Sequence, residues 1–214
     1  MKQINSSNKI NGWDAAYRDK PQQFTEPESI CTLLDTLFPK YGVKRVLDLG
    51  CGNGRHLVYF GKTGYEIHGS DLSGWGLLAA KDWLGKEKLP SRLALADMQY
   101  LPYNEGCFDA IISFRVIRHN LLTDILDTFK ELERLLRPGG LLVIDLLRYD
   151  PDSTRWENAT LLEERTFAPT KGQEKGMPHH AFTKSEIFHI LHKWQIKFFA
   201  TQRDQKHYTI IAQK

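Results

Sequence analysis

The stretch of this 214-residue chain with the clearest chemical pattern is residues 46–56, VLDLGCGNGRH. Gly50, Gly52 and Gly54 alternate directly after a short apolar run, which is typical of a loop whose backbone comes close to a ligand. A dinucleotide fingerprint would read G-x-G-x-x-G, but Arg55 stands where its third glycine belongs. A phosphate-binding loop would end in Lys-Ser or Lys-Thr, and neither pair closes this loop. The spacing therefore disfavours a pyrophosphate ligand.

Acidic residues occupy three further positions, before this loop and after the next two apolar runs. Asp48 precedes the loop, where it could fix the turn or meet a cationic amine. Asp71 ends YEIHGSD, and a carboxylate at that position accepts hydrogen bonds from both hydroxyls of a ribose. Asp97 ends RLALAD, where it could accept an exocyclic adenine amine while Met98 packs on the ring. These residues suit a ligand with a ribose, an adenine and an amine.

A regular alternation of strands and helices is expected to position these residues. Short apolar runs bounded by turn residues predict five strands, at residues 45–50, 65–71, 92–97, 107–114 and 141–147. Apolar residues at helical spacing predict helices from about residue 54, over about 74–85 and over 123–136. Such alternation indicates a parallel sheet with helices on both faces, which binds ligands at the carboxyl ends of its strands.

The segment before this core is expected to be partly irregular. Residues 1–12 are polar, which predicts a loosely held start of the chain. Pro27 suits a first helical position, and the apolar stripe that follows predicts a helix over 27–38.

The segment after the core changes character. Residues 149–181 show no sustained period, which predicts either a lid-like insertion or a mobile loop. Thr183 and Glu186 have the spacing of a capping box and predict a further helix. Two strand-like runs, at 194–201 and 207–214, predict a hairpin that closes one edge of the sheet antiparallel.

Composition excludes several classes of protein. The chain has 29 Lys and Arg against 26 Asp and Glu, without a basic block, which disfavours nucleic acid as a partner. Its three cysteines form no C-x-x-C pair, so neither a disulfide framework nor a zinc site is expected. No apolar run reaches the roughly 18 residues of a membrane span, and the first residues do not resemble a secretory signal. These features predict a cytoplasmic protein without a membrane partner.

Four stretches in order, VLDLGCGNGRH, GSDLS, ALADMQYLPYNEGCFDAIIS and LLRPGGLLVID, resemble class I S-adenosylmethionine-dependent methyltransferases over residues 43–147. The resemblance implies an α/β, doubly wound, mostly parallel seven-stranded Rossmann-like sheet with an antiparallel C-terminal hairpin strand. It also implies one methyltransferase domain over residues 1–214. Its parts are a cofactor-covering segment and helix at 1–42, a cofactor-binding core at 43–148, a lid-like insertion at 149–181, and a helix and hairpin at 182–214.

The same resemblance implies which residues contact S-adenosylmethionine. Asp48 and the glycine loop would border the methionine part, Asp71 would hold the ribose, and Asp97 would contact the adenine. The segment WDAAYRD would fold over the cofactor. The full set is Trp13, Tyr17, Arg18, Asp48, Gly50, Cys51, Gly52, Asn53, Asp71, Leu72, Asp97, Met98, Ser113 and Phe114.

Methyl transfer from a sulfonium needs alignment above all, and a general base only where the acceptor must lose a proton. His119 and Tyr149 are the catalytic candidates, with Arg118 and Asn120 beside His119. The alternative for His119 is that it caps the next helix. The adjacent pair His179 and His180 would point apart on a strand, so no metal ligand set is expected.

The acceptor is expected to be a small molecule. Enzymes that methylate the amino groups of nucleic-acid bases carry N/D-P-P-Y/F after the fourth strand, where this chain reads Ser-Phe-Arg-Val at 113–116. Two other functions stay open: a cofactor-binding partner subunit without its own catalysis, and a nicotinamide-dependent oxidoreductase. The methylated atom and the oligomeric state do not follow from the sequence.

Overall fold

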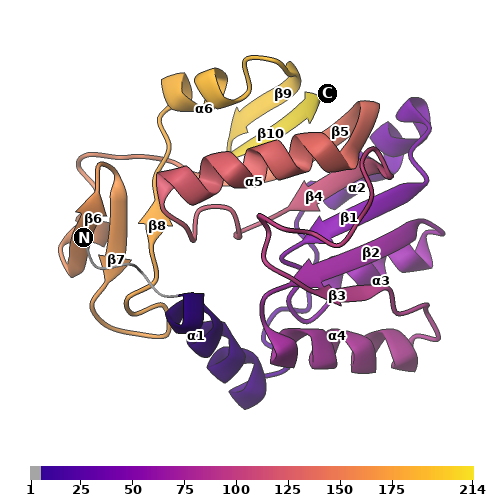
Figure 1. The fold of residues 1–214 in the computed structure, drawn as a ribbon, viewed down its shortest axis with the longest axis horizontal. Coiled ribbons are helices and arrows are strands. Elements are labelled where there is room, and N and C mark those ends of the chain that lie inside the picture. The colour runs from indigo at the N-terminus through magenta and orange to yellow at the C-terminus, as the bar shows by residue number, and fades with distance from the viewer. Residues whose placement is uncertain (1–5) are drawn as a thin grey trace.

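The computed structural model describes residues 6–214, and its centre is a seven-stranded sheet in the order β3-β2-β1-β4-β5-β10-β9 (Figure 1). The first five strands pair in parallel, whereas β10 runs antiparallel to both β5 and β9. This confirms the doubly wound sheet and the C-terminal hairpin. The strands are β1 Arg45–Leu49, β2 Glu66–Asp71, β3 Leu93–Leu95, β4 Phe108–Ser113, β5 Leu136–Leu147, β9 Gln195–Thr201 and β10 His207–Gln213.

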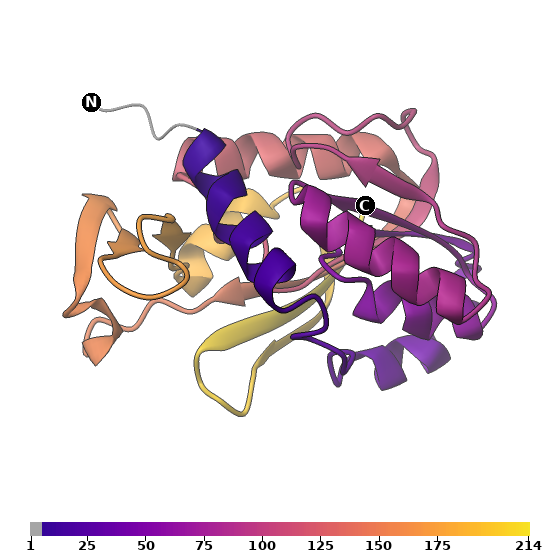
Figure 2. The same ribbon diagram turned by 90° about the horizontal axis from the view of Figure 1, so that it is seen from below.

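Helices cover both faces of this sheet because its central strands bury side chains in both directions. Leu47 and Ile111 pack with α5 and α6, whereas Val46 and Ile112 pack with α2, α3 and α4 on the opposite face. The two layers are visible in Figure 2. The helices are α2 Cys31–Leu37, α3 Arg55–Lys62, α4 Gly74–Lys86, α5 Leu122–Leu135 and α6 Lys184–Ile190. Among the described residues, no helix is both long and apolar enough to cross a membrane.

Three predicted elements have different bounds in the structure. The strand expected at 92–97 is only β3, Leu93–Leu95, so Asp97 lies in the turn after it. The helix expected over 27–38 begins only at Cys31, and a 3-10 helix, η1 (Phe38–Tyr41), follows it. Strand β5 starts at Leu136, five residues earlier than expected from the apolar run at 141–147. The first part of β5 pairs with β4 through an irregular register. Pairing with β4 therefore stabilises as a strand a stretch whose sequence predicts a turn.

The first residues were predicted to be loosely held, and this was wrong for the part that the structure describes. Helix α1 spans Ser6–Asp19, and residues 1–5 lie outside the described residues. The helix packs against α4 and lies between α4 and the 149–181 segment (Figure 2). Ala16 and Tyr17 are buried, so tertiary contacts stabilise a helix whose sequence is mostly polar.

Residues 149–181 form a second, three-stranded antiparallel sheet apart from the first (Figure 1). It consists of β6 Ala159–Glu163, β7 Thr166–Pro169 and β8 His179–His180, preceded by the 3-10 helix η2 Thr154–Trp156. Its strands are too short to show an apolar period. A buried polar contact joins two of them, since the Thr166 hydroxyl lies 2.7 Å from Nδ1 of His180.

Helix α6 follows this small sheet and begins as predicted. The Thr183 hydroxyl accepts a hydrogen bond from the backbone N–H of Glu186 at 3.2 Å, which confirms the N-cap. The Glu186 carboxylate is directed elsewhere, to Arg165 and His180. One half of the capping box is therefore present.

Candidate cofactor and acceptor site

A cavity of about 420 Å³ lies where β1, β2 and β4 reach their carboxyl ends. That is the edge at which a doubly wound sheet binds its ligands. Helix α1 and the loop before β8 contribute to its walls through Trp13 and Glu174. The predicted residues in the walls are Trp13, Tyr17, Gly50, Cys51, Asn53, Asp71, Leu72, Asp97, Met98, Phe114 and His119.

The glycine loop turns sharply at the end of β1. Gly50 and Gly52 have φ of 73° and 51°, in the left-handed region that L side chains rarely adopt. A Cβ on Gly52 would lie 2.1 Å from Oη of Tyr17, and one on Gly50 would lie 2.2 Å from a methyl of Val116. The alternating glycines are therefore needed for close approach of this chain's own side chains as well as for the turn.

Gly52→Ala is expected to displace Tyr17 and to weaken cofactor binding, because the new methyl would clash with Oη at a position already strained for alanine. Gly64→Ala is the matched control: it has φ of 90°, but nothing lies within 4 Å of its Cβ position. It should cost only the conformational penalty of about 1–2 kcal/mol. Thermal unfolding and titration with S-adenosylhomocysteine measure both effects. Equal losses in the two variants would rule out the contact with Tyr17.

Asp71 joins the glycine loop to the turn after β2. Its Oδ2 accepts a hydrogen bond from Gly52 N at 2.7 Å, and its Oδ1 accepts one from Ser73 N at 2.8 Å. Burial raises the pKa of this carboxyl to about 6. Each oxygen keeps acceptor capacity, so the carboxylate is able to receive hydroxyl donors from the cavity.

The wall at the end of β3 contains Asp97 and Met98, with Leu72 from the end of β2. Asp97 Oδ1 accepts a hydrogen bond from Gln99 N at 3.1 Å, which fixes its side chain in the turn. The Met98 sulfur lies 3.3 Å from Nδ2 of Asn120, a further wall residue. An apolar surface and a carboxylate thus stand next to each other, as the predicted adenine contacts require.

Two buried polar atoms in the cavity wall indicate that it receives a polar ligand. Nδ2 of Asn53 and Oγ of Ser70 have no hydrogen-bond partner within the described residues. A buried donor without a partner costs about 1–3 kcal/mol, and a ligand with oxygen acceptors would remove that cost for Asn53. The residues present therefore fit a cofactor that carries polar groups where it meets Asn53 and Ser70.

Three predicted cofactor residues lie near the cavity but outside its walls. Asp48 is 1% exposed and lies 3.4 Å from His56 Nδ1, so its side chain supports the loop from behind. The hydroxyl of Ser113 donates to the carbonyl of Leu49 at 3.1 Å and joins two strands. Gly52 also lies outside the walls, with its N–H bonded to Asp71.

Two other predicted residues are absent from the cavity walls. Arg18 is exposed and pairs with Asp19, so it does not reach the position expected for binding a carboxylate. Tyr149 follows β5 beside Phe182, whose carbonyl accepts its backbone N–H at 2.9 Å, and its side chain is absent from the walls. Neither residue is therefore placed to contact a ligand in this cavity.

The loop after β4 brings Arg118, His119 and Asn120 into the walls together. His119 does not cap α5, whose N-cap is Leu121. Its ring packs edge-on against Trp13, with centroids 5.5 Å apart. Burial and the charge of Arg118 hold the pKa of His119 well below its ordinary value, so the ring is neutral.

Arg115 is a wall residue that the sequence analysis did not single out. Its φ of 66° is unusual for a residue with a side chain. Asp145 holds it in this conformation, since Oδ1 accepts from Arg115 N at 2.6 Å and Oδ2 lies 2.9 Å from Nε. Glu174 and Met177 were also missed, because nothing in the irregular 149–181 stretch marks them as cavity residues.

Comparison with known proteins identifies the segment that carries this cavity. Residues 47–144 match the family described as methyltransferase domain. Over these residues the chain is therefore similar to a methyltransferase domain. The match ends within β5, so the segments on either side of it lie outside the family comparison.

Curated relatives of this methyltransferase domain differ in their named activities. Methyltransferase GfsG of Streptomyces halstedii is 37% identical over 103 residues, which cover 47% of this chain and 36% of GfsG. A tRNA U34 carboxymethyltransferase of Saccharophagus degradans is 32% identical over 108 residues, covering 49% of this chain and 32% of that protein. The chain thus matches about a third of the length of each.

A solved structure extends the similarity to the whole chain. The 1,6-didemethyltoxoflavin-N1-methyltransferase of Burkholderia thailandensis, with 1,6-didemethyltoxoflavin and S-adenosylhomocysteine bound, has a TM-score of 0.72. The superposition covers 100% of this chain and 91% of that one at 18% identity. Identity at this level establishes the shared fold of the methyltransferase domain.

Proposed function

We propose that this chain transfers a methyl group from S-adenosylmethionine to a small-molecule acceptor. The observation that carries the proposal is one cavity that contains the glycine loop, Asp71 at the end of β2, and Asp97 with Met98 at the end of β3. In this proposal Asp71 accepts the ribose hydroxyls, Asp97 and Met98 contact the adenine, and the loop borders the methionine part.

When bound, S-adenosylmethionine would supply a methyl group on a positively charged sulfur; the acceptor atom would bond to that methyl carbon in line while the methyl–sulfur bond breaks and S-adenosylhomocysteine leaves. The protein's contribution is to orient the acceptor in a dry pocket, which is worth up to about 7–11 kcal/mol. Trp13 and Tyr17 of α1 would exclude water from one side. Phe114 and His119 would face the acceptor, since both line the wall beyond the glycine loop.

His119 is the base of this proposal where the acceptor must lose a proton. It is 7% exposed and neutral, and its Nε2 accepts a hydrogen bond from Nε of Arg118, which would have to open before the ring takes a proton. A positioned base contributes about 10²–10⁴-fold. Acceptors that are already anionic would not need it.

A small acceptor is favoured by the cover over the cavity. Glu174 and Met177 bring the 149–181 segment into the walls, and Met177 approaches the backbone of Gly12 in α1. We assign this segment the role of a lid on that ground. Some relatives act on tRNA by name, but this chain lacks a basic block with which to hold a polynucleotide.

Calorimetric titration with S-adenosylhomocysteine, with NAD as the control, tests the proposed cofactor. We expect micromolar binding of S-adenosylhomocysteine alone. Binding of NAD, or of neither compound, would contradict the proposal. Tight cofactor binding without turnover of any acceptor would instead favour a partner subunit without its own catalysis.

A further inference from the structure

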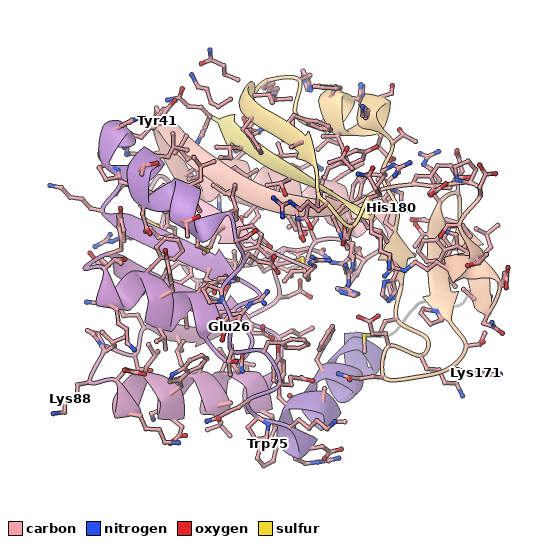
Figure 3. The ribbon with its side chains drawn as sticks, turned by 180° about the vertical axis from the view of Figure 1, so that it is seen from behind. Glu26, Tyr41, Trp75, Lys88, Lys171 and His180 are labelled. Atoms are coloured by element: carbon pink, nitrogen blue, oxygen red, sulfur yellow. The ribbon has the colours of Figure 1, made fainter. Side chains whose placement is uncertain are left out.

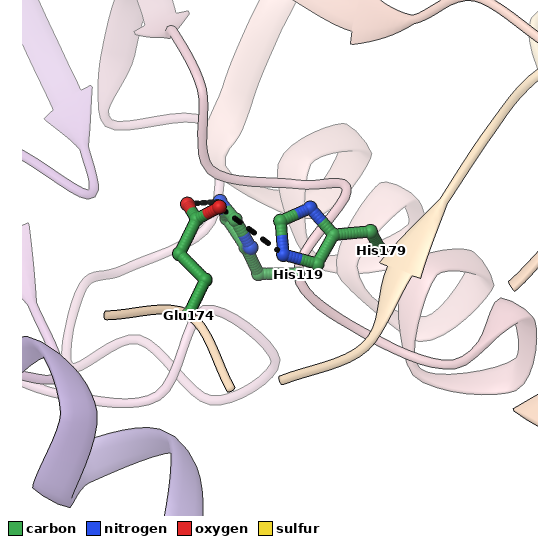
Figure 4. Close-up of side chains that lie close together, drawn as sticks. All are labelled: His119, Glu174 and His179. Carbon is green, nitrogen blue, oxygen red and sulfur yellow. Dashed lines mark ion pairs between the residues drawn. The ribbon is translucent and has the colours of Figure 1, made fainter. Parts of the chain in front are cut away.

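His119, Glu174 and His179 meet beside the acceptor side of the cavity (Figure 4). They come from the loop after β4, the loop before β8, and β8 itself. The two rings are in edge contact, with centroids 4.6 Å apart, and Glu174 approaches both from one side, with Oε1 at 3.9 Å from Nε2 of His119 and Oε2 at 3.4 Å from Nε2 of His179. One nitrogen or oxygen of each residue lies within 4.8 Å of the other two.

His179 lacks the hydrogen bonds that a structural histidine normally makes. It is 2% exposed, yet neither ring nitrogen has a hydrogen-bond partner among the described residues. His180, labelled in Figure 3, is the contrast: its ring lies 2.7 Å from the Thr166 hydroxyl and 3.2 Å from Glu186. The two side chains point apart as the sequence predicted, one to a satisfied structural site and the other to the cluster.

Both rings of the cluster are neutral, and the acceptor nitrogen of His119, Nε2, is held by Arg118. Burial together with Arg118 and Arg155 lowers the pKa of His179 to about 3, and burial likewise keeps His119 neutral. Neutral imidazole and carboxylate are ligands for divalent transition metals, and two histidines with one carboxylate leave coordination positions open.

We infer that His119, Glu174 and His179 bind a divalent transition-metal ion such as Zn²⁺, with its open positions directed to the cavity. Metal–ligand bonds of about 2.0–2.2 Å require ligand atoms roughly 3–3.5 Å apart. The ligand atoms now lie within 4.8 Å of one another, so binding an ion needs Glu174 and the two rings to move inward by roughly an ångström. The site goes beyond the proposed methyl transfer and does not depend on it.

Arg118 opposes the metal and limits its affinity. Its Nε donates to Nε2 of His119 at 3.2 Å, so a cation must displace that hydrogen bond. Its Nη2 lies 3.7 Å from Oε1 of Glu174 and already offsets the one negative charge of the cluster. Replacing this guanidinium by an uncharged side chain of similar length is therefore expected to tighten metal binding.

The test uses the full chain after treatment with a chelator, titrated with Zn²⁺ by calorimetry and with Co²⁺ by visible absorption. We expect one ion per chain in the wild type and at least tenfold weaker binding in His179→Ala and Glu174→Gln. Glu174→Gln keeps the shape of a half-exposed side chain, so it is informative even if His179→Ala folds poorly. His192→Ala removes an exposed imidazole and is the control that should bind as the wild type does.

Arg118→Met is expected to have the opposite effect on metal affinity. It should bind Zn²⁺ at least tenfold more tightly than the wild type, because the competing hydrogen bond and the positive charge are both removed. Wild type that binds no ion, or that binds equally well without His179, would overturn the site. Titration of the same metal-free sample with S-adenosylhomocysteine measures cofactor binding independently of the metal. Failure of the metal site can therefore be distinguished from failure of the proposed function.

Discussion

Asp71→Ala is expected to weaken S-adenosylhomocysteine binding at least tenfold. The substitution removes the acceptor proposed for the ribose hydroxyls, and it also frees the N–H groups of Gly52 and Ser73 that the carboxylate now holds. Unpaired buried donors cost about 1–3 kcal/mol each, so loss of order in the loop adds to loss of the contact. Because the pKa of Asp71 is about 6, binding to the wild type should also weaken as the pH falls below that value.

Calorimetry on Asp71→Ala and on Asp109→Ala measures this effect. Asp109 is a matched control because its Oδ2 also accepts from two backbone N–H groups, of Lys44 at 2.9 Å and of Arg45 at 2.8 Å. It lies at the amino end of β4, away from the cavity. Asp109→Ala should lower stability and leave cofactor affinity unchanged. Unchanged affinity in Asp71→Ala would contradict the placement of the ribose.

Lowering the pH from about 6.5 to about 4 is expected to destabilise the fold by about 3 kcal/mol through His207 alone. Burial and the charge of Arg115 lower the pKa of His207 from 6.5 to about 4. Below pH 6.5 the imidazole of His207 binds a proton in the unfolded chain but stays neutral in the folded chain. The free energy of unfolding therefore falls with pH until His207 is also protonated in the folded state.

The groups that face His207 explain the direction of this shift. Nη1 of Arg118 lies 2.9 Å from its Nε2, and Nη1 of Arg115 lies 2.8 Å from its Nδ1. Asp204, 3.1 Å from Nδ1, raises the pKa but does not compensate for burial beside two arginines.

Urea unfolding at a series of pH values, with His207→Gln beside the wild type, isolates this contribution. His179 also has a lowered pKa and contributes to both proteins, so the difference between them belongs to His207. The variant should lose less stability between pH 6.5 and 4 than the wild type does, by about 3 kcal/mol. Parallel pH profiles would show that His207 is not held neutral in the folded chain.

Local pattern was enough for the parts of the site that lie on the central sheet. Gly50, Cys51 and Asn53 of the glycine loop line the cavity together with Asp71, Asp97 and Met98. Each follows directly at the end of a strand, and parallel strands bring their carboxyl ends to one edge of the sheet. Position along the chain therefore determines position in space for these residues.

Which side chains face the cavity was harder to predict than which segments lie near it. Arg18 is exposed and pairs with Asp19, and neither Arg18 nor Tyr149 is in the cavity walls. Helix α1 was missed for a related reason. Its sequence has little apolar character, and its stability comes from packing of Tyr17 against Gly52 and Gly76.

The amino-acid sequence by itself determined the doubly wound sheet, the methyltransferase-like order of motifs and the cofactor side of the cavity, because strand period, turn glycines and strand-end acids are local signals. Only the tertiary structure decided the acceptor side. His119, Glu174 and His179 are up to 60 residues apart, and the backbone bond from His180 N to the carbonyl of Arg118 at 2.8 Å brings their segments together. A single long-range contact of this kind between a loop and a short strand produces no hydrophobic period, so the sequence pattern does not predict it.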